Sequence, residues 1–277
     1  MKKNERAAAI VRTIVVSLIA VLFVVPLVWM VLSSLKTAPE VFARPFHWLP
    51  ARVQWQNYAT VWMNEEASML RAFANTLYIA LFSIIGQMFI SSLAAYSFAK
   101  INFKGKQVVF MLFLSSMMVP SQLTIIPRFM LFKTIGLYNN LWAIILPAFF
   151  GATSIFMLRQ FYMGLPNDLI EAAKIDGAGH LRIFLRIMLP LTKAALMSLI
   201  ILTFISSWNE YMAQLIFLVK KELYTVSQNI QWYMLDEFKE HNLTMAAATS
   251  AIVPVVILFI VGQKYFVEGI ATSGVKG

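Results

Sequence analysis

The sequence predicts an all-α, polytopic membrane protein with six transmembrane helices, and its composition and hydropathy support that prediction. Of the 277 residues, 60% are hydrophobic and only 13% are charged, whereas soluble domains average about 45 to 50% apolar and about 25% charged residues. Six apolar runs reach the length of about 20 residues that a helix needs to cross a bilayer core of about 30 Å. Each run must be helical, because a segment exposed to lipid has to satisfy its own backbone hydrogen bonds.

The chain has no internal repeat, low-complexity segment or soluble linker, so we expect a single membrane domain over residues 1–277. The predicted spans cover residues 10–32, 72–98, 108–126, 141–162, 191–218 and 243–266. Basic residues precede the first span, as they would in a secretory signal. Its apolar run is longer than a signal's, however, and it continues through Leu27–Leu32 without a cleavage site of small residues. We therefore expect the first helix to stay uncleaved.

The segments between the first four spans differ in character. Residues 33–71 are rich in proline and tryptophan, which punctuate a chain and favour the membrane interface. They predict either a lid of short surface helices on the outer face or a direct contact with a ligand. Residues 100–107 form a tight basic turn, and residues 127–140 are expected to be a surface segment.

Pro120 interrupts the third span beside Ser121, Gln122 and Thr124. A proline frees a backbone carbonyl and kinks a helix. The polar neighbours either satisfy that carbonyl or line a water-filled path, and both interpretations stay open.

The basic residues indicate the orientation, because cytoplasmic loops are enriched in lysine and arginine. With a cytoplasmic N-terminus, 14 of the 23 basic residues fall on the inner side, although the outer loops are much longer. Both termini are therefore expected in the cytoplasm. Attraction to anionic lipid headgroups accounts for the net charge of +10, so no nucleic acid is needed to explain it.

Residues 166–190 form a polar insert between the fourth and fifth spans, on the predicted cytoplasmic side. Asn167 or Asp168 is suited to cap a helix, with Glu171 completing a capping box. Gly177 or Gly179 then takes the left-handed conformation that ends it. A second short helix begins near His180, and the helix kinks at a later proline. The insert is thus predicted to be a helix-turn-helix.

The first of these short helices presents small residues on one face. Leu169, Ala172, Ala173 and Asp176 recur at helical spacing, and small side chains allow a partner to approach the backbone closely. Asp176 is locally unfavourable near a helix C-terminus, by about 0.3 to 1 kcal/mol. A residue that is unfavourable for the local helix indicates that a tertiary contact or a function requires it.

The insert resembles the EAA signature of permease subunits from ATP-binding-cassette importers. The matching residues are Glu171, Ala172, Ala173, Asp176, Gly177, Ala178, Ile187, Leu189 and Pro190. Most of the chain from about Ser34 onward is similar to the carbohydrate, maltose-type branch of this family. The similar stretches are 55–58, 94–99, 118–120, 137–140, 208–211 and 268–277. Ser273 departs from that pattern, because relatives commonly carry a small apolar residue or glycine there.

The resemblance implies a prokaryotic inner-membrane protein that works within a larger assembly. Its partners would be a homologous second permease, two cytoplasmic ATPase subunits, an extracytoplasmic solute-binding protein and a sugar substrate. Glu171 would pair with a basic residue of the ATPase, and the tail residues Gly274, Val275 and Lys276 would reach toward it. The loop of residues 220–242 would probe the binding protein.

The chain itself is expected to hold no cofactor and to catalyse nothing. It lacks the glycine-rich phosphate-binding loop of ATPases, so ATP and Mg²⁺ should bind to the partner subunits. His47, His180 and His241 are scattered, and cysteine is absent, which argues against a metal site.

A possible substrate path involves Trp208, Asn209, Glu210 and Gln122. An ionisable group within a span is costly and indicates function, and the neighbouring tryptophan offers a sugar a stacking face. The alternative is a structural hydrogen bond of Glu210 between helices. An ion-coupled secondary transporter is the competing function, but it predicts inverted repeats and several intramembrane carboxylates. The choice among mono-, di- and oligosaccharides stays open.

Overall fold

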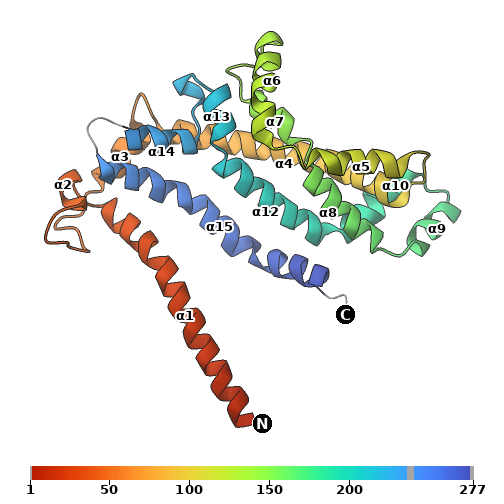
Figure 1. Cartoon of the computed structure of the whole chain (residues 1–277), viewed down its shortest axis with the longest axis horizontal. Helices are drawn as coiled ribbons and strands as arrows, with labels where there is room; N and C mark the ends of the chain where they lie inside the picture. The colour runs from red at the N-terminus through yellow and green to blue at the C-terminus, as the bar shows by residue number, and fades with distance from the viewer. Residues whose placement is uncertain (1, 236–239, 275–277) are drawn as a thin grey trace. The chain divides into compact units, whose positions relative to one another are not determined.

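The computed structural model describes residues 2–235 and 240–274, with the side chains of residues 8–235 and 240–263. Every regular element in this described part is a helix, and no strand occurs there, which confirms the all-α prediction (Figure 1). In chain order the elements are α1 (Lys2–Ser33), α2 (Ala38–Val41), α3 (Gln56–Met63), α4 (Met69–Lys100), α5 (Lys106–Ser116), α6 (Ser121–Thr134), α7 (Trp142–Ala148), α8 (Ala152–Met163), α9 (Asp168–Ile175), α10 (His180–Ile183), the π-helix η1 (Phe184–Met188), α11 (Leu189–Leu191), α12 (Lys193–Asn209), α13 (Met212–Phe217), the 3-10 helix η2 (Lys221–Leu223), α14 (Val226–Leu235) and α15 (His241–Gly274).

Several helices are long and apolar enough to cross a membrane, as the sequence predicts. Among the described residues, four segments qualify alone: Ala8–Ser33, Met69–Lys100, Trp142–Met163 and His241–Gln263. Two further pairs qualify jointly but are bent, α5 with α6 by 95° and the helix of residues 180–191 with α12 by 77°. The described chain therefore provides up to six spans.

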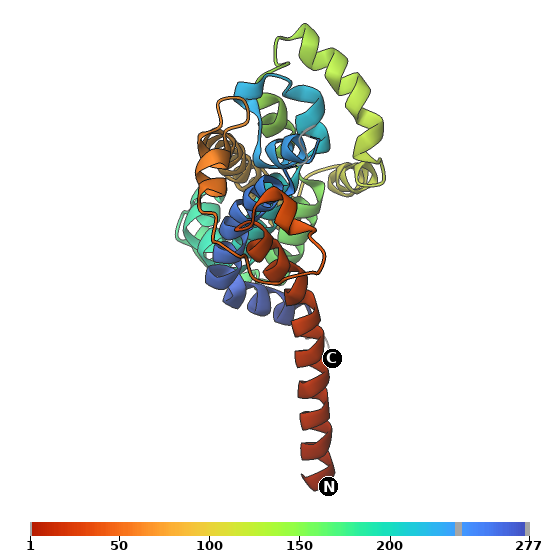
Figure 2. The same ribbon diagram turned by 90° about the vertical axis from the view of Figure 1, so that its left-hand side faces the viewer.

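The third predicted span differs from a kinked continuous helix. The helix α5 ends at Ser116, and α6 begins after Pro120, whose backbone is extended at φ −57° and ψ 130°. Proline has no N–H to continue the helical hydrogen bonds, so the chain turns sharply at this point. In both views α6 stands away from α5 (Figures 1 and 2). The expected surface segment of residues 127–140 is helical up to Thr134.

The fifth predicted span is also broken. The helix α12 ends at Asn209, Glu210 is extended at ψ 128°, and a new helix begins at Met212. The carboxylate of Glu210 accepts a hydrogen bond of 2.9 Å from the backbone N–H of Ala213, which satisfies one of the free donors at the start of α13. The side chain of Glu210 thus stabilises the break that its own backbone makes.

The described chain divides into two compact units. The first consists of Met1–Leu70 and Asn229–Val253. Within it, the connection from α1 to α4 carries the short helices α2 and α3, as predicted. Asn57 donates 2.8 Å hydrogen bonds to the carbonyls of Ser34 and Lys36, and the fully buried Lys36 donates to the carbonyl of His47. These bonds give the connection a fixed shape.

The second unit consists of Arg71–Gln228 and Pro254–Gly277. Its helix α8 contacts both α5 and α12. The largest core cluster joins side chains from α4, α5, α8, α9, α10, η1 and α12, among them Tyr96, Phe110, Tyr162, Ile170 and Phe184. Burial of these apolar groups anchors the short helices α9 and α10 to the long ones, at about 25 cal/mol for each Å² of apolar surface removed from water.

Candidate functional site

The predicted helix-turn-helix is present, and backbone hydrogen bonds close its turn. The N–H of Ala178 donates to the carbonyl of Ala173 at 2.9 Å, and the N–H of Gly177 donates to that of Lys174 at 3.0 Å. Gly177 has the positive φ of 76° that this C-terminal motif requires. Gly179, the alternative considered above, instead precedes α10 in an extended conformation. The turn therefore depends on Gly177.

The predicted helix cap differs from the structure. Asp168 is the first helical residue of α9, and Asn167 makes no side-chain bond to the helix N-terminus. The Oδ1 atom of Asn167 instead accepts a 2.7 Å hydrogen bond from the Nζ atom of Lys100, which also donates to the carbonyl of Leu165 at 2.6 Å. A charged donor outcompetes a neutral backbone N–H, so Asn167 joins α9 to the end of α4.

The signature residues of α9 lie on two faces rather than one. Ala173 is only 9% exposed and packs with Ile170 in the core cluster, whereas Glu171, Ala172 and Asp176 face outward. The prediction that Ala172 and Ala173 share a partner-facing surface is thus wrong. A helix has 3.6 residues per turn, so adjacent residues diverge by about 100° and only one of the two alanines can point inward.

The second half of the signature mainly supports packing. Ile187 and Leu189 are partly buried against the core cluster, and Pro190 is exposed. The helix widens to a π-helix over Phe184–Met188, just before the proline whose missing N–H breaks the regular hydrogen-bond ladder. The chain then bends at Thr192, whose Oγ1 atom donates to the carbonyl of Met188 at 2.9 Å.

One further bond ties the insert to a long helix. The Tyr96 hydroxyl of α4 lies 3.1 Å from His180 Nδ1 at the start of α10. Together with Lys100, this contact fixes both short helices to the same end of α4. Of the predicted tail residues, Gly274 is the last residue of α15, and Val275 and Lys276 lie outside the described residues.

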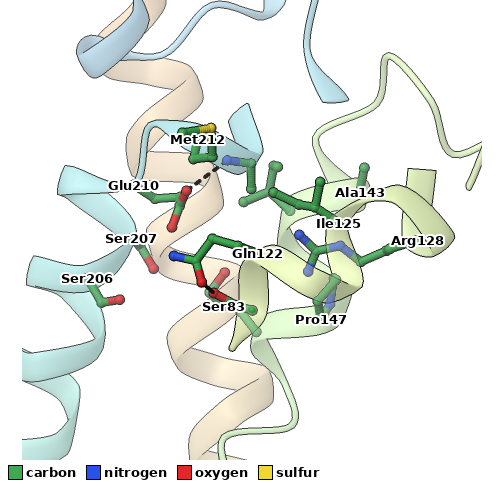
Figure 3. Close-up of a pocket in the computed structure, with 14 residues that line it drawn as sticks. Ser83, Gln122, Ile125, Arg128, Ala143, Pro147, Ser206, Ser207, Glu210 and Met212 are labelled. Carbon is green, nitrogen blue, oxygen red and sulfur yellow. Dashed lines mark hydrogen bonds between the residues drawn. The ribbon is translucent and has the colours of Figure 1, made fainter. Parts of the chain in front are cut away.

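A second candidate site is a polar cavity of about 290 Å³ within the second unit. It is lined by Ser83, Ser121, Gln122, Ile125, Arg128, Ala143, Ile144, Pro147, Ala148, Ser206, Ser207, Glu210, Met212 and Ala213. These residues come from α4, α6, α7, α12 and α13 and from the α12–α13 break (Figure 3). The bends described above bring them together. Gln122 and Glu210, both predicted from the sequence, are among them.

The cavity contains one positive and one negative side chain. The guanidinium group of Arg128 lies 5.0 Å from the centre of the Phe217 ring, and Glu210 attracts it electrostatically. Gln122 lines the same cavity as these two charged groups (Figure 3). A charge-balanced wall with an amide and several hydroxyl groups is suited to hydrogen-bond an uncharged polar molecule.

Trp208 and Asn209 do not line this cavity. Trp208 is 3% exposed, with its ring stacked on Phe204 at 5.3 Å and edge-on to Phe73 at 5.4 Å. The Nδ2 atom of Asn209 donates to the carbonyl of Ile205 at 2.8 Å. The predicted stacking face for a ligand is therefore wrong, because neighbouring aromatic rings already cover Trp208.

A second cavity of about 370 Å³ shares Pro147, Ala148, Ser206 and Ser207 with the first. Gln87 of α4 lines it and joins two other helices. Its Nε2 atom donates to Ser154 Oγ at 3.0 Å, and its Oε1 atom accepts from Thr203 Oγ1 at 2.7 Å. The two cavities thus adjoin each other along α12, and Gln87, Ser154 and Thr203 place polar groups in the second one.

Arg128 and Ser83 were not predicted from the sequence as cavity residues. Pro127 led to the interpretation of residues 127–140 as surface, although Ser121, Gln122, Ile125 and Arg128 recur at helical spacing. That spacing was the available signal. Ser83 lies within an apolar span and carries no signal of its own.

Comparisons with known proteins agree with this architecture. Residues 87–272, more than half of the chain, match the family described as "Binding-protein-dependent transport system inner membrane component". The chain also resembles a solved chain from "a bacterial ABC transporter involved in the import of the acidic polysaccharide alginate", with a TM-score of 0.84 and 23% identity over 95% of this chain and 98% of the other. This likeness supports the fold.

Relatives of known sequence cover nearly the whole chain. The arabinooligosaccharides transport system permease protein AraQ of Bacillus subtilis is 33% identical, over 96% of this chain and 95% of its own length. The melibiose/raffinose/stachyose import permease protein MelC of the same organism is 30% identical, over 96% of both chains. The sn-glycerol-3-phosphate transport system permease protein UgpE of Pectobacterium atrosepticum is 29% identical, over 94% of both. The chain therefore belongs to the family of binding-protein-dependent transport system inner membrane components, as the signature in α9 to α11 predicts.

Proposed function

We propose that the chain is a permease subunit of an ATP-driven sugar importer and forms part of the solute path. The main support is that the polar cavity carries no net charge. Arg128 and Glu210 both line it and attract each other, and amide and hydroxyl groups complete the wall. Relatives named for oligosaccharide transport at 33% and 30% identity point to the same class of solute.

The assembly would contain a second permease, two ATPase subunits and an extracytoplasmic solute-binding protein. ATP and Mg²⁺ would bind to the ATPase subunits, and both termini of this chain would lie in the cytoplasm. ATP-driven association of the ATPases can shift the permease only if they bind its two conformations with different affinities. The family match and the EAA signature favour this function over an ion-coupled secondary transporter.

The outward face of α9 and α10 would dock an ATPase subunit. Glu171 is exposed there and is free to pair with a basic residue. Ile175 and Leu181 are 87% and 65% exposed on these two helices. A partner that covered them would gain apolar burial, while Gly177 allows close approach.

A transport assay with the complete assembly tests this proposal. The chain would be reconstituted in vesicles with its second permease, ATPase and binding protein, and supplied with labelled arabinotriose or raffinose. We expect uptake that requires ATP on the ATPase side and binding protein on the other. Uptake driven by a proton or sodium gradient without ATP would refute the proposal.

A further inference from the structure

Three basic side chains converge where α4 ends. Lys106 Nζ donates to the carbonyls of Ile101 at 2.9 Å and Ala99 at 3.4 Å. The Nε atom of Arg159 in α8 donates to the carbonyl of Phe98 at 3.3 Å, and Lys100 reaches the Leu165 carbonyl as described above. We call Lys100, Lys106 and Arg159 the basic cluster. The exposed Lys104 lies on the turn beside it.

Among the described residues, no carboxylate pairs with the charges of the basic cluster. Lys106 repels Lys100, and Arg159 repels Lys106. In the described part of the chain, none of the three forms an ion pair with a carboxylate; they contact backbone carbonyls, the amide of Asn167 and the Phe110 ring. Carbonyl groups at a helix C-terminus attract cations, but each such interaction is worth only about 0.3 to 1 kcal/mol. A net positive charge is left in a partly buried place.

The basic cluster also borders an apolar surface. The helix α5 begins at Lys106, immediately after Gly105 turns the chain with a φ of 80°. Large apolar side chains on α5 are exposed within its first two turns, namely Val108, Val109, Met111 and Leu112. A cationic group at the end of an exposed apolar helix matches a molecule with an anionic head and hydrocarbon chains.

We propose that the basic cluster with Lys104 binds the phosphate of an anionic phospholipid, whose acyl chains lie along α5. Ammonium and guanidinium groups form strong charge-assisted hydrogen bonds with phosphate, and basic pockets between membrane helices bind anionic headgroups. The lipid supplies the counter-charge that the described residues lack at this point and covers the apolar face of α5. A free phosphate ion would supply only the charge.

Native mass spectrometry of the full chain within its purified complex tests this proposal. Phosphatidylglycerol and phosphatidylcholine with identical acyl chains are titrated separately, and inorganic phosphate is added as a competitor. We expect phosphatidylglycerol to bind more tightly than phosphatidylcholine. Replacement of Lys104 by Gln should weaken phosphatidylglycerol binding about fivefold, and the K104Q/K106Q pair about 25-fold.

Matched variants distinguish binding at a specific site from general attraction of the lipid to positive charge. Lys106→Arg keeps the charge and should keep the affinity, and Lys133→Gln removes an exposed lysine from α6 and should leave it unchanged. Equal binding of the two lipids, or unchanged affinity in K104Q, would overturn the proposal. Displacement by millimolar inorganic phosphate alone would also overturn it, because it would show a site for free anions. K104Q changes an exposed side chain, so its result stands even if the double variant fails to fold.

Discussion

The Nζ atom of Lys100 lies 2.7 Å from Asn167 Oδ1 and thereby joins the end of α4 to the residue that precedes α9. The bond connects residues 67 positions apart in the sequence. A displacement of α9 would therefore act on α4, the long helix that also lines the polar cavity through Ser83.

Replacement of Asn167 by Leu should loosen this connection. It removes the acceptor but leaves every basic residue in place, at a cost of about 1 kcal/mol for a partly exposed charged hydrogen bond. We expect backbone amides of residues 168–176 to exchange with deuterium about fivefold faster, measured by mass spectrometry. Asn167→Asp keeps the acceptor and serves as the control; equal protection in all three proteins would show that the bond contributes nothing.

Gly177→Val should prevent the ATPase subunit from docking while membrane insertion persists. Valine resists the φ of 76° at this position, with a strain of at least about 1 to 2 kcal/mol, so the turn opens. Co-purification with the ATPase measures the effect. Gly179→Ala is the matched control, because Gly179 has an ordinary extended backbone and open space around its Cβ position. Retention of the ATPase by Gly177→Val would contradict the prediction.

Glu210→Gln should change the charge preference of transport rather than abolish it. Glutamine can still accept the hydrogen bond from Ala213, but Arg128 is left without its counter-charge in the cavity. We expect uptake of a galacturonate oligosaccharide to rise relative to that of a neutral one of equal length. The ratio of the two uptake rates is the measurement, and an Arg128→Met/Glu210→Gln double variant should restore the original ratio. An unchanged ratio in the single variant would exclude a role for this charge.

Trp208→Ala should lower stability without altering the affinity for solute. The ring fills a buried site between Phe73 and Phe204, and removal of a buried tryptophan costs about 3 to 5 kcal/mol. Thermal unfolding of the detergent-solubilised complex measures the loss, while Trp208→Phe should recover much of it. A raised KM for uptake at unchanged stability would show instead that Trp208 contacts the solute.

Local sequence signals predicted the short elements well. Gly177 ends α9 because a left-handed backbone is a local requirement, and glycine meets it wherever the rest of the chain lies. The resemblance carried by Glu171 to Pro190 likewise identified the family, since the spacing of that motif does not depend on tertiary contacts.

Which side of each helix packs inward, and where the helices bend, was harder to predict. Nothing in the alternation of small residues indicates that Ala173 rather than Ala172 faces the core, because that depends on which side of α9 meets Tyr162 and Phe184. The predicted third span ends before Pro127, yet Pro127 lies within α6, because membrane helices tolerate proline when neighbouring groups satisfy the freed carbonyl. The same error concealed Arg128. The bend before α6 also depends on packing, so the cavity could not be derived from hydropathy alone.

Among the described residues, the hydrogen bonds that close the turn after α9 join main-chain atoms, from the N–H groups of Gly177 and Ala178 to the carbonyls of Lys174 and Ala173. Residues such as Glu171, Lys174 and Ile175 can therefore be exchanged without unfolding the element that displays them. This separation would let evolution change what the outward face of α9 binds by altering a few side chains, while the helix-turn-helix kept its backbone shape.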